Sequence, residues 1–130
     1  MFLDTSAIIA YQQGDDRTVE YVSGGRPWYT STICVFEYLN GRLGTGKTDV
    51  VSARQEISDV QPLALEEPVA LEAARLQDEI LKSGERLATT DMLIAATARS
   101  TGDEFVVADG DFETAALEDL MQVTNLRDPA

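Results

Sequence analysis

Short apolar runs that favour β-strands alternate along this chain with segments of helical spacing, and this alternation constrains its fold more than any other feature. The expected strands span residues 2–3, 28–30, 60–65, 105–108 and 121–124. The expected helices lie between them, at residues 5–11, 18–23, 32–43, 47–58, 68–83, 90–98 and 111–117. Strands separated by helices pair in parallel, so we expect an α/β fold, a small parallel sheet of about five strands with helices on both faces.

Three of these segments also indicate their place in the fold. Pro62 has no N–H for a sheet hydrogen bond, which predicts an edge position for the strand at 60–65. The segment at 92–98 is apolar nearly all round, so we expect it to be a helix buried in the middle of the domain. One face of the helix at 68–83 carries an apolar stripe, formed by Val69, Ala73, Leu76 and Ile80. The chain of 130 residues contains no repeat or linker, so we expect one domain over residues 1–130.

The composition removes most catalytic chemistries. The chain has no histidine and a single cysteine, which excludes a Ser-His-Asp triad, a Cys-His pair, an imidazole base, a structural zinc site and an intrachain disulfide. Carboxylates remain in quantity, since 23 Asp and Glu face 10 Lys and Arg and the net charge is −13. Chemistry built from carboxylates indicates either a hard cation such as Mg²⁺ or Mn²⁺ or a carboxylate acid–base pair.

The acidity also bears on partners and location. It argues against a nucleic acid held by a broad basic surface. The two lysines, Lys47 and Lys82, are few beside so many acids, which fits either a salt-adapted protein or a mesophilic one with an acidic surface. No signal-peptide pattern opens the chain and no apolar run approaches 18 residues, so we expect a cytoplasmic protein with no membrane partner.

Four acids stand at places where functional groups gather in α/β proteins. Asp4 follows the first expected strand and Asp109 the fourth, at the carboxyl ends where parallel sheets bind ligands. Asp91 heads the most apolar helix, and Glu37 is the only charge within residues 33–39. A purely structural interpretation stays open, in which Asp4 and Asp109 cap helices and Asp91 interacts favourably with a helix dipole.

Convergence of these acids would require neutralisation. Two like charges 4 Å apart repel by about 4 kcal/mol at an effective dielectric constant of 20. One or two Mg²⁺ or Mn²⁺ ions would supply the opposite charge, and such ions promote phosphate-ester hydrolysis without a histidine. Asp111 lies close behind Asp109 and joins the candidate set.

Four short motifs, in this order along the chain, resemble those of PIN-domain ribonucleases of the VapC toxin type. The motifs are Leu3-Asp4-Thr5-Ser6-Ala7, residues 32–41 with Glu37 and Gly41, residues 90–98 with Asp91, and residues 106–112 with Asp109 and Asp111. Each motif alone is weak, but together they run in the family's order from the start of the chain to residue 112, so the resemblance extends over nearly the whole chain. One position departs from the family pattern, because Val107 stands where the family often has Thr or Ser.

The resemblance implies an endoribonuclease that depends on Mg²⁺ or Mn²⁺ and hydrolyses RNA phosphodiesters as the toxin of a toxin–antitoxin pair. It also implies a homodimer and a cognate antitoxin that blocks the site. It assigns catalysis and metal binding to Asp4, Glu37, Asp91 and Asp109, an auxiliary metal contact to Asp111, and the orientation of Asp4 or of a metal-bound water to Ser6. Whether Asp109 or Asp111 contacts the metal directly stays open.

Two other functions remain as alternatives. One is a non-catalytic PIN-like module that binds RNA or protein and need not retain the four acids. The other is a metal-dependent phosphoesterase that acts on a small substrate. Four cations are candidates for contacts with RNA phosphates, although a solvated surface role is favoured for each: Arg42, Lys47, Arg86 and Arg99.

Overall fold

A five-stranded parallel sheet forms the centre of the protein, in a computed structural model that describes residues 1–109 and 115–127. The strands are β1 (Phe2–Leu3), β2 (Trp28–Ser31), β3 (Val60–Leu63), β4 (Phe105–Val107) and β5 (Val123–Asn125). Their order across the sheet is β3-β2-β1-β4-β5, and every neighbouring pair is parallel. The predicted fold class is confirmed, and β3 with its Pro62 lies at an edge as expected.

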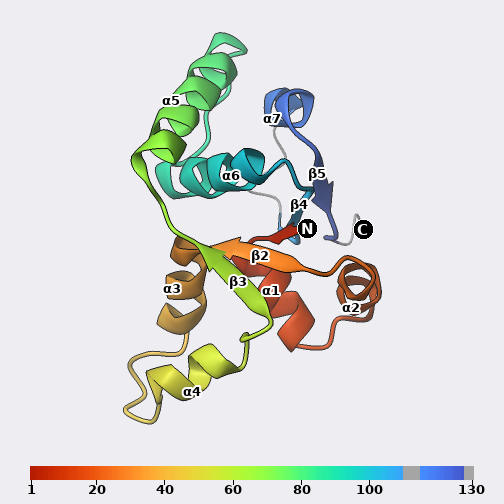
Figure 1. Ribbon diagram of the computed structural model, residues 1–130, viewed down its shortest axis with the longest axis vertical. Coiled ribbons are helices and arrows are strands. Elements are labelled where there is room, and N and C mark those ends of the chain that lie inside the picture. Colours follow the sequence, from red (N-terminus) through yellow and green to blue (C-terminus); the bar gives the residue numbers. More distant parts are fainter. Residues whose placement is uncertain (110–114, 128–130) are drawn as a thin grey trace.

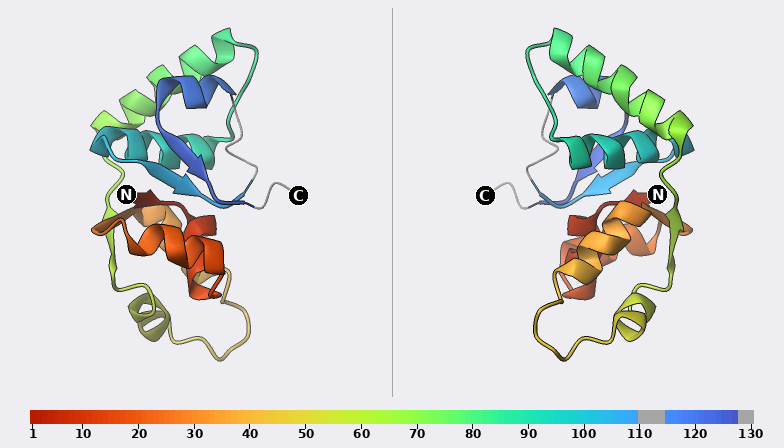
Figure 2. Two further views of the ribbon diagram at one scale, coloured as in Figure 1. Left: turned by 90° about the vertical axis from the view of Figure 1, so that its right-hand side faces the viewer. Right: turned by 90° about the vertical axis from the view of Figure 1, so that its left-hand side faces the viewer.

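Helices cover both faces of this sheet (Figures 1 and 2). On one side lie α5 (Glu67–Lys82), α6 (Thr89–Thr101) and α7 (Ala115–Leu120). On the other side lie α1 (Thr5–Gln12), α2 (Asp16–Ser23), α3 (Thr32–Asn40) and α4 (Val50–Gln55). No helix in the described ranges has both the length and the apolar character needed to cross a membrane.

The alternation of side chains along the central strands divides the core in two. Phe2 and Phe105 point to the face that α5 and α6 cover, and their rings meet edge to face with centroids 5.8 Å apart. Leu3 and Val106 point to the opposite face, where they pack with residues of α1 and α2. Because these strands are buried on both faces, each reads as a continuous apolar run instead of an alternating one.

The helical patterns behave as expected. The stripe on α5 buries Ala73, Leu76 and Ile80 against α6, with Val69 partly buried beside them. On its polar side Asp78 and Lys82 form an ion pair of 3.4 Å. Helix α6 is buried from Met92 to Ala98 except at Leu93, which is half-buried, so its nearly uniform apolar character reflects a central position.

Several element boundaries differ from those expected. The helix expected at 47–58 is shorter, because the Asp49 carboxylate accepts hydrogen bonds from the N–H groups of Val51 and Ser52 and thereby starts α4 at Val50. The helix expected to reach residue 43 ends at Asn40, with Gly41 as its C-cap. The last strand begins at Val123 instead of residue 121. The first residues of the helix expected at 111–117 lie outside the described ranges.

Candidate active site

The Asp4 carboxyl group is held at the carboxyl end of the central strand. Its backbone N–H donates to the carbonyl of Val106 on β4 at 3.1 Å. Its side chain caps α1 by accepting a 2.9 Å hydrogen bond from the N–H of Ala7, and only 3% of the residue is exposed. The predicted capping role is therefore real, but a cap on a surface helix does not require such burial.

The surroundings of Asp4 change its ionisation. Burial raises its pKa from 3.8 to about 7, although the Ala7 N–H and the Ser6 hydroxyl lower it, and the charge of Asp109 raises it further. Asp4 and Asp109 follow the neighbouring parallel strands β1 and β4, so both acids stand at the same edge of the sheet. Such a pair of acids favours a proton or a cation between or beside them.

Ser6 connects Asp4 to the strand that carries Asp109. The Ser6 hydroxyl lies 2.7 and 2.9 Å from the two oxygens of the Asp4 carboxylate, to which it donates. The same oxygen accepts a 2.9 Å hydrogen bond from the N–H of Ala108, the residue before Asp109. The carbonyl of half-buried Asp109 accepts in turn from the Asn125 amide at the end of β5, at 2.7 Å. These bonds fix the carboxyl ends of β1, β4 and β5 relative to one another.

Glu37 reaches the same edge of the sheet from α3. The Thr5 hydroxyl donates to its carboxylate oxygen Oε1 at 2.7 Å, and Thr5 directly follows Asp4. No role of Thr5 could be predicted from the sequence, since nothing in the local pattern indicates that residues 5 and 37 meet. Cys34, one turn earlier on α3, is fully buried. Burial raises its pKa, the Thr5 and Thr30 hydroxyls lower it and the charge of Asp4 raises it, so the thiol lies beneath this site.

Asp91 is placed at this edge by the direction of its helix. Helix α6 runs antiparallel to the strand that follows it, so its first turn lies at the edge where β4 ends (Figure 2). The helix begins at Thr89, slightly earlier than expected, and half-buried Asp91 is the acid of its first turn. Asp111 lies outside the described ranges.

The described residues bring the candidate acids to one edge but not into one cluster. The charge of Asp109 raises the pKa of Asp4, and Glu37 is linked to the start of α1 through Thr5. Within residues 1–109 and 115–127, no three histidine, cysteine, aspartate or glutamate side chains are positioned to hold one metal ion. The donors at this edge are carboxylate and hydroxyl oxygens, and two of the carboxyl groups repel each other. This donor chemistry fits a hard divalent cation.

Comparisons with known proteins identify the family. The PIN domain family matches residues 1–117 of the chain. Ribonuclease VapC5 of Mycobacterium tuberculosis is 30% identical over 129 residues, which cover 96% of this chain and 93% of that protein.

Two solved structures resemble the chain over nearly its whole length. FitAcB from Neisseria gonorrhoeae gives a TM-score of 0.78 at 27% identity, with 96% of each chain covered. VapBC-5 of Mycobacterium tuberculosis, from the VapBC family of toxin–antitoxin systems, gives a TM-score of 0.69 at 28% identity, with 98% of this chain and 97% of that chain covered. The resemblance carried by the four motifs is confirmed, and the chain belongs to the PIN domain family.

Proposed function

We propose that this chain is a metal-dependent endoribonuclease and the toxin of a toxin–antitoxin pair. The observation that carries the proposal is the buried Asp4 carboxyl group, which interacts with Asp109 at the carboxyl end of the central strand. A buried acid next to a second acid is unfavourable for folding alone, so it points to a function that uses the charge. The relative named a ribonuclease supports RNA as the substrate.

The candidate residues of this proposal are of two kinds, metal ligands and residues that position those ligands. Asp4, Glu37, Asp91 and Asp109 would hold the Mg²⁺ or Mn²⁺, with Asp111 as an auxiliary ligand. The metal, when bound, neutralises these carboxylates, lowers the pKa of a water molecule and stabilises the leaving oxygen. Ser6 fixes the orientation of the Asp4 carboxylate, and Thr5 does the same for Glu37. Asp4 must lose its proton to act as a ligand, so metal binding near pH 7 is accompanied by proton release.

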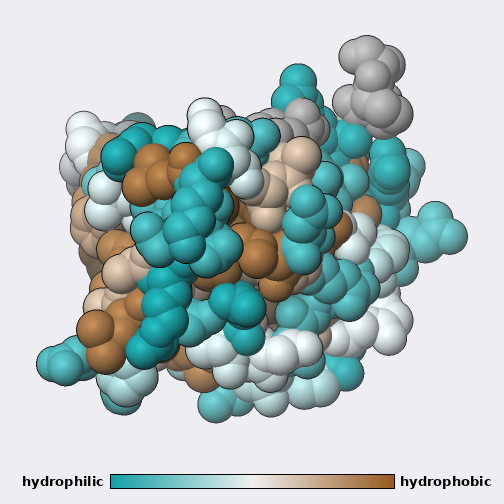
Figure 3. All heavy atoms as spheres, turned by 90° about the horizontal axis from the view of Figure 1, so that it is seen from above, coloured by the Kyte–Doolittle hydropathy of each residue, from teal (hydrophilic) through white to brown (hydrophobic). Residues whose placement is uncertain are grey.

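The proposal also covers organisation and partners. Residues 1–130 form one PIN-like domain that acts in the cytoplasm as a homodimer and is blocked by a cognate antitoxin. The similar structure from Mycobacterium tuberculosis is described as a member of the VapBC family of toxin–antitoxin systems, which supports such a partner. The surface seen from above carries apolar patches among hydrophilic ones (Figure 3). Helix α5 exposes Leu71 and Leu81, and Phe36 on α3 is 61% exposed, which provides apolar surface for protein partners.

Cleavage of total RNA with Mg²⁺ or Mn²⁺ tests this function. The comparison sets wild type against Asp4→Asn and Asp91→Asn, with Asp78→Asn on α5 as a matched control, since Asp78 is exposed and distant from the candidate site. We expect cleavage by wild type and Asp78→Asn, and a loss of at least 100-fold in the other two, the scale of removing a charge-stabilising group. Equal cleavage by all four proteins would refute the catalytic assignment. RNA binding without cleavage would support the non-catalytic alternative, and hydrolysis of bis-p-nitrophenyl phosphate alone would support the small-substrate phosphoesterase.

A further inference from the structure

An open groove leads away from Glu37 between α1, α3 and α4. Its first part has Glu37, Gln12 and Tyr38 in its walls and extends to Arg42 and Glu56. Its second part starts at the same Arg42 and Glu56 and continues along the loop between α3 and α4, where its wall includes Thr45, Lys47, Thr48 and Ser52. We call this the α3–α4 groove. It joins the candidate active site to a loop that carries two of the chain's ten cations.

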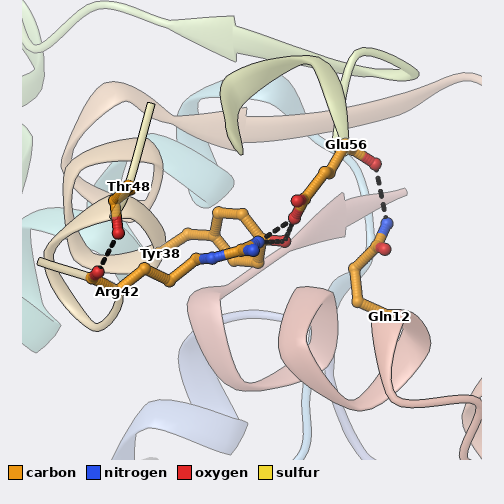
Figure 4. A network of polar contacts seen from close by, with 5 residues as sticks. All are labelled: Gln12, Tyr38, Arg42, Thr48 and Glu56. Carbon is orange, nitrogen blue, oxygen red and sulfur yellow. Dashed lines mark hydrogen bonds and ion pairs between the residues drawn. The ribbon is translucent and has the colours of Figure 1, made fainter. Parts of the chain in front are cut away.

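Arg42 is held in a fixed position on the wall of the groove (Figure 4). Its Nη1 forms an ion pair with the Glu56 carboxylate and donates to the Tyr38 hydroxyl at 3.2 Å. The Tyr38 hydroxyl donates to Glu56 at 2.7 Å, and the Gln12 amide donates to the Glu56 carbonyl at 2.8 Å. The Arg42 side chain is nevertheless 43% exposed, and its Nη2 makes no hydrogen bond within the described ranges. An oriented guanidinium with free donors is suited to a phosphate group.

Lys47 differs from the other lysine of the chain. Lys82 forms ion pairs with Asp78 and Glu79 on α5. The Lys47 ammonium, by contrast, makes no ion pair or hydrogen bond with any residue that the structure describes. The exposed Lys47 ammonium is therefore available to a ligand, although Glu37, Asp49 and Glu56 place three carboxylates in the walls of the same groove.

The acids of the groove are already engaged inside the protein. The Asp49 carboxylate accepts from the N–H of Val51 and caps α4, and Glu56 is paired with Arg42. Glu37 accepts from Thr5 and belongs to the candidate active site. The side chains left to bind a ligand are therefore the Lys47 ammonium and the outer edge of Arg42, with the hydroxyls of the loop beside them.

We infer that the α3–α4 groove binds the sugar–phosphate backbone of one RNA strand and leads it to the carboxylates near Glu37. Lys47 and Arg42 contact phosphates, while the groove reads no base. This inference rests on the proposed ribonuclease function and adds the path of the substrate.

The test measures binding of a fluorescein-labelled single-stranded RNA by fluorescence anisotropy at several salt concentrations. It uses Asp4→Asn as the non-cleaving background, since asparagine also caps helices. Lys47→Gln and Arg42→Gln are compared with Lys82→Gln and Arg75→Gln, two exposed cations on α5, on the opposite side of the sheet. Thermal unfolding of each variant checks that Arg42→Gln still folds; Lys47 has no such structural role.

Each phosphate contact in single-stranded RNA contributes about 0.7 to the slope of log affinity against log salt concentration. We expect Lys47→Gln to lower this slope by about 0.7 and to weaken binding about fivefold at 0.1 M salt, and the α5 variants to change neither. In the active background, Lys47→Gln should raise KM and leave kcat unchanged, as for a residue that binds substrate and transition state alike.

The outcomes separate this inference from the proposed function. If wild type cleaves RNA but Lys47→Gln and Arg42→Gln retain its KM and salt slope, the groove assignment is wrong and the nuclease assignment stands. If wild type does not cleave RNA but Lys47→Gln loses salt-dependent RNA binding, the groove assignment stands without the nuclease. Binding of labelled poly-glutamate is measured in the same way. If Lys47→Gln and Arg42→Gln lose poly-glutamate binding but retain RNA binding, the groove binds an acidic protein segment and the inference is overturned.

Discussion

Replacing Asp4 by Asn in the metal-free protein isolates the energetic consequence of burying this acid. Asparagine retains an oxygen that accepts from the Ala7 N–H and the Ser6 hydroxyl, and it removes the charge. The pKa of Asp4 rises from 3.8 to about 7 in the folded protein. At 1.36 kcal/mol per pKa unit, this rise corresponds to a destabilisation of about 4 kcal/mol when the carboxyl group is ionised.

The direction of the pH dependence follows from proton binding. Between about pH 4 and pH 7 the folded chain keeps the Asp4 proton that the unfolded chain releases, so the contribution of Asp4 to stability falls as the pH rises and is constant above the folded pKa. The Asp4→Asn variant has no carboxyl group at this position, so its stability lacks this pH-dependent contribution. Its stability relative to wild type should therefore increase between pH 4 and pH 7, by up to about 4 kcal/mol and by no more than about 1.4 kcal/mol per pH unit.

Urea unfolding in EDTA, followed by circular dichroism from pH 4 to pH 8, measures this difference. Asp78→Asn, at an exposed acid on α5, is the control and should follow the wild-type curve. A stability difference between Asp4→Asn and wild type that does not change with pH would refute the argument. Addition of Mn²⁺ should then stabilise wild type by about 2.7 kcal/mol at 100 times its Kd, and the Asn variant by less.

Three further substitutions have defined outcomes. Thr5→Val removes the hydrogen bond to Glu37 while keeping the shape of the side chain, so kcat for RNA cleavage should fall about tenfold. Thr5→Ser retains the hydroxyl and should have the wild-type kcat. Full activity of Thr5→Val would contradict the positioning role. Ser31→Ala removes the α3 cap and should lower the free energy of unfolding by about 1 kcal/mol, measured in urea. Leu76→Ala, at a core position with 1% exposure, should lower it by about 2–5 kcal/mol; a loss below about 1 kcal/mol would mean that α5 packs loosely on α6.

Features that depend on local pattern are predictable from the sequence of this protein. Pro62 identifies an edge strand because the missing N–H acts at that residue alone. The buried position of α6 follows from apolar residues on all its sides. The positions of Asp4 and Asp109 after strands are also predictable, because a short apolar run precedes each acid.

Contacts between distant segments are not predictable in this way. The hydrogen bond from Thr5 to Glu37 depends on how α1 packs against α3, and the ion pair of Arg42 with Glu56 depends on the path of the loop between α3 and α4. The start of α4 depends on which of several polar residues provides the cap, and only the structure shows that Asp49 does. The residues that orient the acids are therefore harder to find from sequence than the acids themselves.

The pairing of β1 with β4 has a consequence for biosynthesis. Phe2 pairs with Phe105, so the central strand acquires this neighbour only after about one hundred further residues have been translated. At roughly 5–20 residues per second this delay is on the order of 5–20 s. Asp4 and Asp109 remain apart throughout that interval. A chain that has been translated only as far as β3 therefore lacks the carboxylate pair, and the pair can form only after Asp109 has been made.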